Sequence, residues 1–133
     1  DIRVIIGGIH TTICYDQLLR KYPSLIAVLG EGEITFPELL DNLDAPEKID
    51  GLAYFKDGDV ITTPKRGFIK DLDSIPFPKH ELFFKGKRTH AYVMAGRGCP
   101  SNCIFCCLHA INERKYRVRS VENIIKEIDF LMD

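Results

Sequence analysis

Two short apolar runs near the start of the chain each end in glycine. Ile2–Ile6 is closed by Gly7 and Gly8, and Leu25–Leu29 is closed by the glycine-containing segment Gly30–Glu33. Apolar runs of this length, rich in β-branched residues and bounded by glycine, are typical of buried strands that lead into loops. The sequence therefore predicts two buried strands. Their glycine loops would lie at the carboxyl edge of a sheet, where open α/β sheets bind ligands.

Apolar residues at helical spacing follow each predicted strand. Tyr15–Lys21 predicts a helix that Pro23 stops, and Ile34–Leu43 predicts a second helix, with Thr35 as its cap and Pro37 in its first turn. The order strand, helix, strand, helix with short joints predicts parallel strands joined by right-handed crossovers.

The middle of the chain predicts a hairpin and then a connector. Two β-rich runs, Gly51–Phe55 and Val60–Thr63, flank the dipeptide Asp57–Gly58, which is typical of a type I′ turn. Gly67–Pro78 carries two prolines among aspartates and predicts an extended connector.

The last third predicts a strand, a cysteine-rich loop and a helix. Thr89–Met94 is the predicted strand, and Ser120 is the predicted cap of a helix that ends near Met132. The apolar residues of this helix recur at intervals of three and four, which places them on one stripe. They are Val121, Ile124, Ile125, Ile128 and Leu131. Because apolar segments lie at both ends of the chain, we expect it to be part of a longer protein.

The composition is that of an ordinary globular protein. The 133 residues are 45% hydrophobic and 28% charged, with a net charge of −1. Basic residues gather between Phe84 and Arg119, a pattern more typical of a solvated surface or a small-anion site than of an RNA groove. No apolar run approaches the ~20 residues of a bilayer span, and no signal-peptide pattern opens the chain.

Four of the five cysteines lie between Cys99 and Cys107. Their odd number and close spacing argue against the disulfide framework of a secreted protein and favour a reducing cytoplasm. Cys99, Cys103 and Cys106 have the spacing Cys-x3-Cys-x2-Cys, which differs from ferredoxin and zinc-ribbon spacings. Thiolates are soft ligands for iron–sulfur clusters or zinc. Three protein ligands on a four-iron cluster would leave one iron open to a cofactor or substrate.

A zinc site is the alternative interpretation of this loop. His109 lies three residues after Cys106 and would complete a Cys3His site. Together with the basic stretch Arg114–Arg119, such a site would make a zinc-stabilised RNA-binding module. Cys107 lies outside the ligand spacing and is expected to be a neighbour, and Cys14 is expected in the core. Three histidines gain no role from the sequence: His10, His80 and His90.

The stretch from Met94 to Cys106 closely resembles the signature of the radical S-adenosylmethionine superfamily. The resemblance implies a [4Fe-4S] cluster whose free iron chelates S-adenosylmethionine, and whose electron cleaves it to a 5′-deoxyadenosyl radical. It implies three cluster ligands: Cys99, Cys103 and Cys106. It also implies that Phe105 lies near the adenine, and that the predicted strand and helix on either side of the loop open a (β/α) barrel.

Residues 1–66 resemble the C-terminal half of the cobalamin-binding-type domain that often precedes this barrel. The matching segments are Val4–His10, Val28–Glu33, Thr35–Glu38 and Ile49–Tyr54, and the joint Leu72–Pro78 also matches. In that family the glycine loops face the nucleotide tail of the corrin. The implied binding residues are Gly7, Gly8, Gly30, Glu31 and Gly32. The alternative is that these glycines only make tight turns. The segment that supplies a cobalt-ligating histidine in some relatives is absent, so cobalamin binding stays open.

Together the resemblances imply an α/β fold with three parts. These are a partial Rossmann-like parallel sheet with a hairpin in 1–66, a connector in 67–88, and the first strand, loop and helix of a radical S-adenosylmethionine (β/α) barrel in 89–133. The implied parent is an Fe–S oxidoreductase, similar to anaerobic magnesium-protoporphyrin ester cyclases, that reductively cleaves S-adenosylmethionine or methylates through cobalamin.

The implied cofactors are the [4Fe-4S] cluster, S-adenosylmethionine and cobalamin, with an external electron donor and an unspecified small-molecule substrate. We expect a cytoplasmic enzyme without a membrane span or a nucleic-acid partner. The chain taken alone is expected to be inactive and to self-associate through an unpaired strand edge.

Overall fold

The structure is a computed structural model that describes residues 2–83 and 90–132. The chain divides into two compact units, Asp1–Ile69 and Lys70–Asp133. The domain boundaries expected after residues 66 and 88 stay predictions. Within the described ranges, no helix combines the length and the apolar composition that a bilayer crossing requires.

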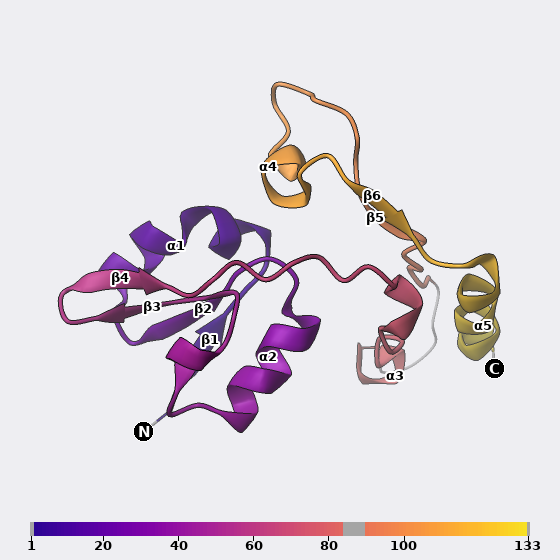
Figure 1. The fold of residues 1–133 in the computed structure, drawn as a ribbon. Coiled ribbons are helices and arrows are strands. Elements are labelled where there is room, and N and C mark those ends of the chain that lie inside the picture. The colour runs from indigo at the N-terminus through magenta and orange to yellow at the C-terminus, as the bar shows by residue number, and fades with distance from the viewer. Residues whose placement is uncertain (1, 84–89, 133) are drawn as a thin grey trace. The chain divides into compact units, whose positions relative to one another are not determined.

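The first unit is a four-stranded sheet with a helix on each face (Figure 1). Its elements are β1 (Val4–Ile6), α1 (Ile9–Lys21), β2 (Leu25–Val28), α2 (Gly32–Asp41), the 3-10 turn η1 (Pro46–Lys48), β3 (Leu52–Lys56) and β4 (Asp59–Thr62). The strand order is β1-β2-β3-β4, and β1 and β2 are parallel as predicted. Strand β1 therefore lies at the edge of the sheet.

The predicted hairpin is confirmed, and it joins the same sheet. Asp57 and Gly58 have φ angles of 51° and 89°, the two positive values that a type I′ turn requires. Strand β3 pairs antiparallel with β2, with Leu52 opposite Val28. The sequence predicted the hairpin, but not that it would extend the sheet as antiparallel strands.

The core of the first unit lies on both faces of the sheet. Alternate residues of β2 point to opposite faces, so Val28 and Ala27 belong to different clusters. One cluster, on the α2 face, consists of Val28, Leu39, Ile49 and Leu52. The other, on the α1 face, consists of Leu19, Ala27 and Ala53.

Helix α1 is longer than predicted, beginning at Ile9 instead of Tyr15. Gly8 precedes it with a φ of 91°, a conformation that favours glycine. The hydroxyl of Thr11 donates to Gly7 O at 3.0 Å, and that of Thr12 donates to Gly8 O at 2.9 Å. These bonds bind the first turn of the helix to the glycine loop.

Helix α2 also begins earlier than predicted, at Gly32. The expectation that Thr35 caps it is wrong: Thr35 is buried within the helix, and its hydroxyl donates to Asp50 O at 3.3 Å. Pro37 consequently lies inside the helix and not in its first turn.

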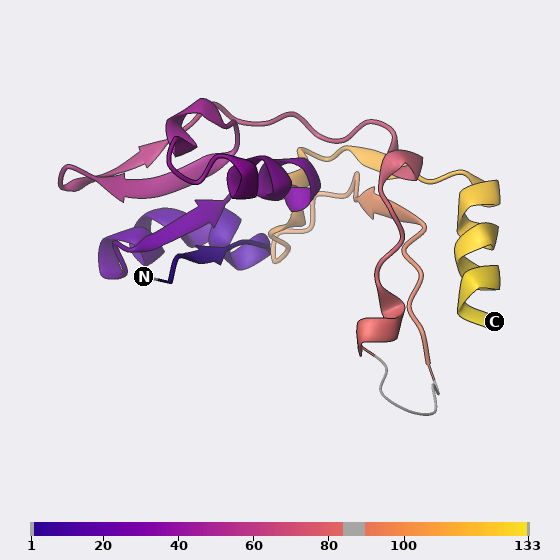
Figure 2. The ribbon, with the colours of Figure 1, turned by 90° about the horizontal axis from the view of Figure 1, so that it is seen from below.

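The second unit contains a two-stranded antiparallel ribbon and a C-terminal helix (Figure 2). Its elements are η2 (Leu72–Ser74), α3 (His80–Phe83), β5 (Gly96–Gly98), α4 (Leu108–Asn112), β6 (Tyr116–Val118) and α5 (Val121–Met132). The predicted connector Gly67–Pro78 thus contains η2 near its middle.

The prediction of a strand at Thr89–Met94 is wrong over the part that the structure describes. Thr89 lies outside the described residues, and residues 90–94 form no strand. The strand is instead β5, because the glycines at 96 and 98 let its backbone approach β6 closely. The predicted cap is confirmed, since Ser120 Oγ accepts a hydrogen bond from the N–H of Asn123 at 3.1 Å.

Candidate functional site

The cysteine loop begins directly after β5, and glycine is required on both sides of Arg97 in that strand. A Cβ atom on Gly98 would lie 1.9 Å from Lys115 O, and one on Gly96 would lie 2.7 Å from Arg117 O. Gly98 also has a φ of 95°. The close pairing of β5 with β6 therefore requires the sequence Gly-Arg-Gly before Cys99.

The cysteines of the loop are free and solvent-accessible. Cys99 and Cys106 are half-buried, and Cys103 and Cys107 are exposed; none is in a disulfide. The N–H of Cys106 donates to Cys103 O at 3.1 Å, which closes a turn between these two predicted ligands. Free cysteine is ordinarily among the most buried residue types. Accessible thiols in a tight loop therefore suit a ligand role better than a packing role.

The electrostatics of Cys99 favour the thiolate. Hydrogen bonds from the backbone N–H and the side chain of Ser101 hold the pKa of the Cys99 thiol below its usual value of about 9. The thiolate is the form of cysteine that binds metal. The donor set of three soft, accessible thiols thus fits an iron–sulfur cluster in its chemistry.

The structure does not gather these thiols around one point. Among the residues that it describes, no three His, Cys, Asp or Glu side chains form a group that could hold a metal ion. His109, the fourth ligand of the zinc interpretation, is likewise not grouped with the cysteines. Its Nδ1 is buried without a hydrogen-bond partner. The geometry therefore does not distinguish the iron–sulfur interpretation from the zinc interpretation. The fit of the loop to an iron–sulfur cluster rests on the chemistry of its thiol donors.

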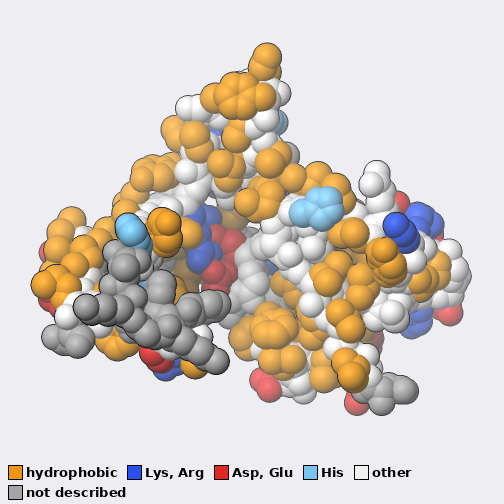
Figure 3. All heavy atoms as spheres, turned by 180° about the vertical axis from the view of Figure 1, so that it is seen from behind, with side chains coloured by type: hydrophobic (Ala, Val, Ile, Leu, Met, Phe, Trp, Pro, Cys, Tyr) orange, Lys and Arg blue, Asp and Glu red, His pale blue; other side chains and the backbone are white. Residues whose placement is uncertain are grey.

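The apolar side chains next to the cysteines in the loop are exposed to solvent. Ile104 is fully exposed and Phe105, the expected adenine neighbour, is 90% exposed. Figure 3 shows apolar side chains gathered at the tip formed by this loop. Cys14, expected in the core, is only half-buried.

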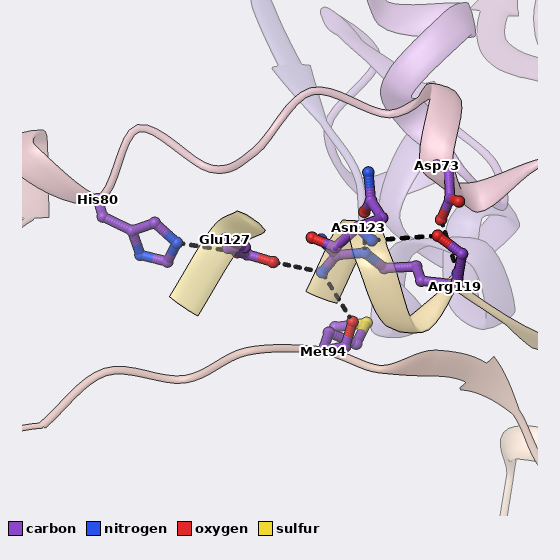
Figure 4. Close-up of polar contacts among 7 residues, drawn as sticks. Asp73, His80, Met94, Arg119, Asn123 and Glu127 are labelled. Atoms are coloured by element: carbon purple, nitrogen blue, oxygen red, sulfur yellow. Dashed lines mark hydrogen bonds and ion pairs between the residues drawn. The ribbon is translucent and has the colours of Figure 1, made fainter. Parts of the chain in front are cut away.

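The second unit also contains a polar network that the sequence did not predict, built around the buried side chains of His80 and Glu127 (Figure 4). We call it the Arg119 network, and its members are Asp73, His80, Met94, Arg119, Ser120, Asn123 and Glu127. Arg119 pairs with Glu127 through Nη1 and donates to Met94 O at 3.0 Å. Its Nε donates to Asn123 Oδ1 at 2.7 Å, and the guanidinium lies 5.4 Å from the centre of the Phe77 ring.

The other carboxylate oxygen of Glu127 faces His80. His80 Nε2 lies 3.0 Å from Glu127 Oε1, and since a carboxylate only accepts, Nε2 carries the hydrogen. Burial acts to raise the pKa of Glu127, but the hydrogen bonds from His80 and Arg119 outweigh it and hold that pKa below its usual value of about 4.5.

Asp73 connects the start of α5 to the segment before α3. Its Oδ1 accepts from the N–H of Ser120 at 2.9 Å. Hydrogen bonds from the side chain of Ser120 and from this N–H lower the pKa of Asp73. One signal in the sequence could have revealed the network. Glu127 lies three residues after Ile124 and four before Leu131, within the apolar stripe of the helix.

The first unit offers a separate candidate site at the carboxyl edge of β1 and β2. Gly7, Gly8, Gly30 and Gly32 come together there and border a pocket of about 170 Å³. Its lining also includes Ile5, Ile6, Val28 and Phe36. Four of the five predicted binding residues thus share one pocket. The fifth, Glu31, instead accepts a hydrogen bond from the N–H of Ile69 at 2.9 Å.

Thr12 ties the two glycine loops of this edge together. Its hydroxyl donates to Gly8 O at 2.9 Å and accepts from the N–H of Gly30 at 3.0 Å. A Cβ on Gly7 would lie 3.7 Å from Val28 Cβ, which is ordinary contact. The loops therefore need glycine mainly for backbone conformation, at Gly8 and Gly30 with φ of 91° and 76°.

No protein-family model matches the chain. Among curated proteins, it is 36% identical over 98% of its length to an uncharacterized methyltransferase of Pyrococcus horikoshii, of which it covers 30%. It is 33% identical over 99% of its length to the anaerobic magnesium-protoporphyrin IX monomethyl ester cyclase of Rubrivivax gelatinosus, of which it covers 26%. The chain thus spans less than a third of these relatives.

A solved structure supports the same relationship. The cobalamin-dependent S-adenosylmethionine radical enzyme OxsB, with aqua-cobalamin and S-adenosylmethionine bound, matches 96% of this chain with a TM-score of 0.73 and 26% identity. The chain covers 18% of that protein. The match includes both units of the chain and therefore both candidate sites.

Proposed function

We propose that this chain is a segment of a radical S-adenosylmethionine enzyme with a cobalamin-binding-type domain, as its similarity to such enzymes supports. In this proposal the cysteine loop holds a [4Fe-4S] cluster for the reductive cleavage of S-adenosylmethionine. One observation carries the proposal. Cys99, Cys103 and Cys106 are free, accessible thiols on a loop whose spacing would leave one iron of such a cluster without a protein ligand.

The residues of the loop have separate tasks in this proposal. The three cysteines bind the cluster as thiolates, and Ser101 stabilises the thiolate of Cys99. The exposed ring of Phe105 provides an apolar surface for the adenine of S-adenosylmethionine. When bound, the cluster supplies an open iron site and one electron, which must come from an external donor.

The pocket at the carboxyl edge of the first unit is proposed to take part of a cobalamin. OxsB binds cobalamin, and the corresponding edge here is built from glycine loops that allow a ligand close to the backbone. Gly7, Gly8, Gly30 and Gly32 border that pocket, and Glu31 adjoins it by its place in the chain.

The zinc-stabilised RNA-binding alternative is not favoured. The similar proteins of named activity are enzymes, including an ester cyclase and a methylthiotransferase. We propose a cytoplasmic enzyme acting on a small molecule, in keeping with the thiol-rich loop.

Iron analysis after anaerobic reconstitution tests the cluster. We expect about four iron atoms per chain and loss of most of them in Cys99→Ala, Cys103→Ala and Cys106→Ala variants. Cys107→Ala is the matched control, because Cys107 lies in the same loop outside the spacing. Equal loss from Cys107→Ala, or retention in Cys103→Ala, contradicts the proposal. One zinc per chain and no iron would favour the zinc module.

Self-association of the isolated chain is also proposed, through β1. In the described part of the sheet, β1 pairs only with β2, and a free parallel edge presents unpaired backbone groups that pair with other chains. Light scattering after size exclusion is expected to show a dimer or larger species. A monodisperse monomer at high concentration contradicts this.

A further inference from the structure

We propose that Arg119, Glu127 and His80 act as a positioning group that fixes the strand leading into the cysteine loop. This inference rests on the proposed role of the loop in holding a cluster, and it assigns a task to three residues that touch neither the cysteines nor the sheet-edge pocket.

Helix α5 buries the side chain of Glu127. Glu127 is 1% exposed, while Ile125 on the same helix is 50% exposed. Helix α5 thus turns a carboxylate inward and leaves apolar side chains at its surface. Burying a carboxylate costs free energy unless its oxygens are paired, and an apolar residue would fill the position without that cost. The carboxylate is therefore explained by its partners.

Arg119 carries the constraint from Glu127 to the strand. Its Nη1 pairs with Glu127 and also donates to Met94 O at 3.0 Å. Its backbone N–H donates to Ala95 O at 2.9 Å. Met94 and Ala95 are the last residues before β5, and Cys99 is the first after it. Arg119 thus fixes the backbone immediately before the strand that leads to Cys99.

His80 holds the same carboxylate from the opposite side. His80 is 6% exposed and comes from α3, a segment far from α5 in sequence. A second contact runs in parallel, from Asp73 to the N–H of Ser120. Glu127 is thereby fixed between two segments, which keeps Arg119 in one orientation.

The geometry requires arginine at position 119. Its guanidinium donates through Nε, Nη1 and Nη2 to Asn123, Glu127 and Met94. A lysine has one nitrogen and cannot reach these acceptors together. Arg119→Lys therefore keeps the charge and removes the fork that connects α5 to the strand.

Amide hydrogen exchange in the metal-free protein tests the positioning directly. The variant is Glu127→Gln, which keeps the shape of the side chain, and the control is Glu122→Gln at an exposed site on the same helix. We expect exchange of the amides of 94–98 and 116–119 to rise at least about tenfold in Glu127→Gln, and to rise less in α4. A rise no larger than in α4, or no rise, overturns the inference.

A second experiment uses the reconstituted protein and Arg119→Lys. At equal iron content, we expect a shifted electron paramagnetic resonance spectrum of the reduced cluster and faster iron loss to a chelator than in the unaltered protein. A lowered unfolding temperature with an unchanged spectrum and unchanged iron loss overturns the inference. If the unaltered protein binds no iron, the proposed function fails, while hydrogen exchange in the metal-free protein still decides whether Arg119 and Glu127 position the strand.

Discussion

The two compact units of this chain are stabilised in different ways. In Asp1–Ile69 the buried side chains are mostly apolar and lie on both faces of one sheet. In the described residues of Lys70–Asp133, Leu72 is the buried apolar residue, and the polar side chains of His80 and Glu127 are buried as well. The first unit has an ordinary core, while the second is tied together by directional polar contacts.

The difference matches the two tasks proposed for the units. A two-faced apolar core makes a firm edge for a pocket. A polar network instead fixes particular backbone atoms, here Met94 O, in the segment that leads into β5. The second unit also leaves many large apolar side chains exposed. They include Tyr92, Met94, Ile104, Phe105, Tyr116, Val118, Val121 and Ile125.

Removal of the buried carboxylate should have the largest effect on stability, and this effect should be confined to the second unit. Glu127→Ala removes the shared partner of Arg119, which is largely buried, and of His80, which is buried. Breaking a buried pair in this way costs about 3–5 kcal/mol. Hydrogen exchange should place this loss in the second unit and leave the amides of β2 and β3 unchanged. An effect below about 1 kcal/mol would mean that the network does not stabilise this unit.

The matching change in the first unit is Leu39→Ala. Leu39 is fully buried in the α2-side cluster, and truncation of a buried leucine costs about 3 kcal/mol. The neighbouring Leu40 is 49% exposed, so Leu40→Ala is the control and should change the free energy of unfolding by about 0.5 kcal/mol or less. Equal effects of the two variants in denaturant titrations would refute the assignment of the core.

Acid should destabilise the second unit more than the first. The pKa of Glu127 is held below about 4.5 in the folded state, so its contacts stabilise the fold above that pH and are lost as pH falls through the folded-state pKa. Asp73, whose pKa is also lowered by Ser120, adds to the same trend. The second unit should therefore lose stability below about pH 4.5. Circular dichroism of Glu127→Gln should show a weaker acid dependence, and an unchanged dependence contradicts the role of Glu127.

The smallest effect on stability is expected from Thr12, whose hydroxyl connects the two glycine loops. Thr12→Val removes the hydroxyl that bridges Gly8 and Gly30, at a cost of about 1 kcal/mol. Thr12→Ser keeps the hydroxyl and should restore most of the stability. Thermal unfolding of both variants checks this, and equal loss in the two would show that the methyl group matters instead.

Local patterns in the sequence predicted much of the first unit. The apolar runs before Gly7 and Gly30 are strands, they are parallel, and Asp57–Gly58 makes the predicted turn. The antiparallel addition of the hairpin to β2 could not be derived, because periodicity does not specify which strands pair. Thr35 was misassigned because a threonine near a helix start is typical of a cap, whereas tertiary packing buries this one.

The second unit was harder to predict, because its structure depends on pairs distant in sequence. The spacing of Cys99, Cys103 and Cys106 identified the candidate ligands, a prediction that the structure leaves untested. Glu127 and His80 are 47 residues apart, and a carboxylate on a helix is usually solvent-facing. The apolar run before Met94 resembled a strand, but backbone pairing begins two residues later, at the glycines.

The most direct test of the central claim is electron paramagnetic resonance of the reduced, reconstituted protein before and after addition of S-adenosylmethionine. Three cysteine ligands leave one iron of the cluster free to bind the added molecule. We predict a cluster spectrum that shifts when S-adenosylmethionine is added, and the same shift in Cys107→Ala. A cluster spectrum that S-adenosylmethionine leaves unchanged would contradict the claim that Cys99, Cys103 and Cys106 hold a cluster with an open site.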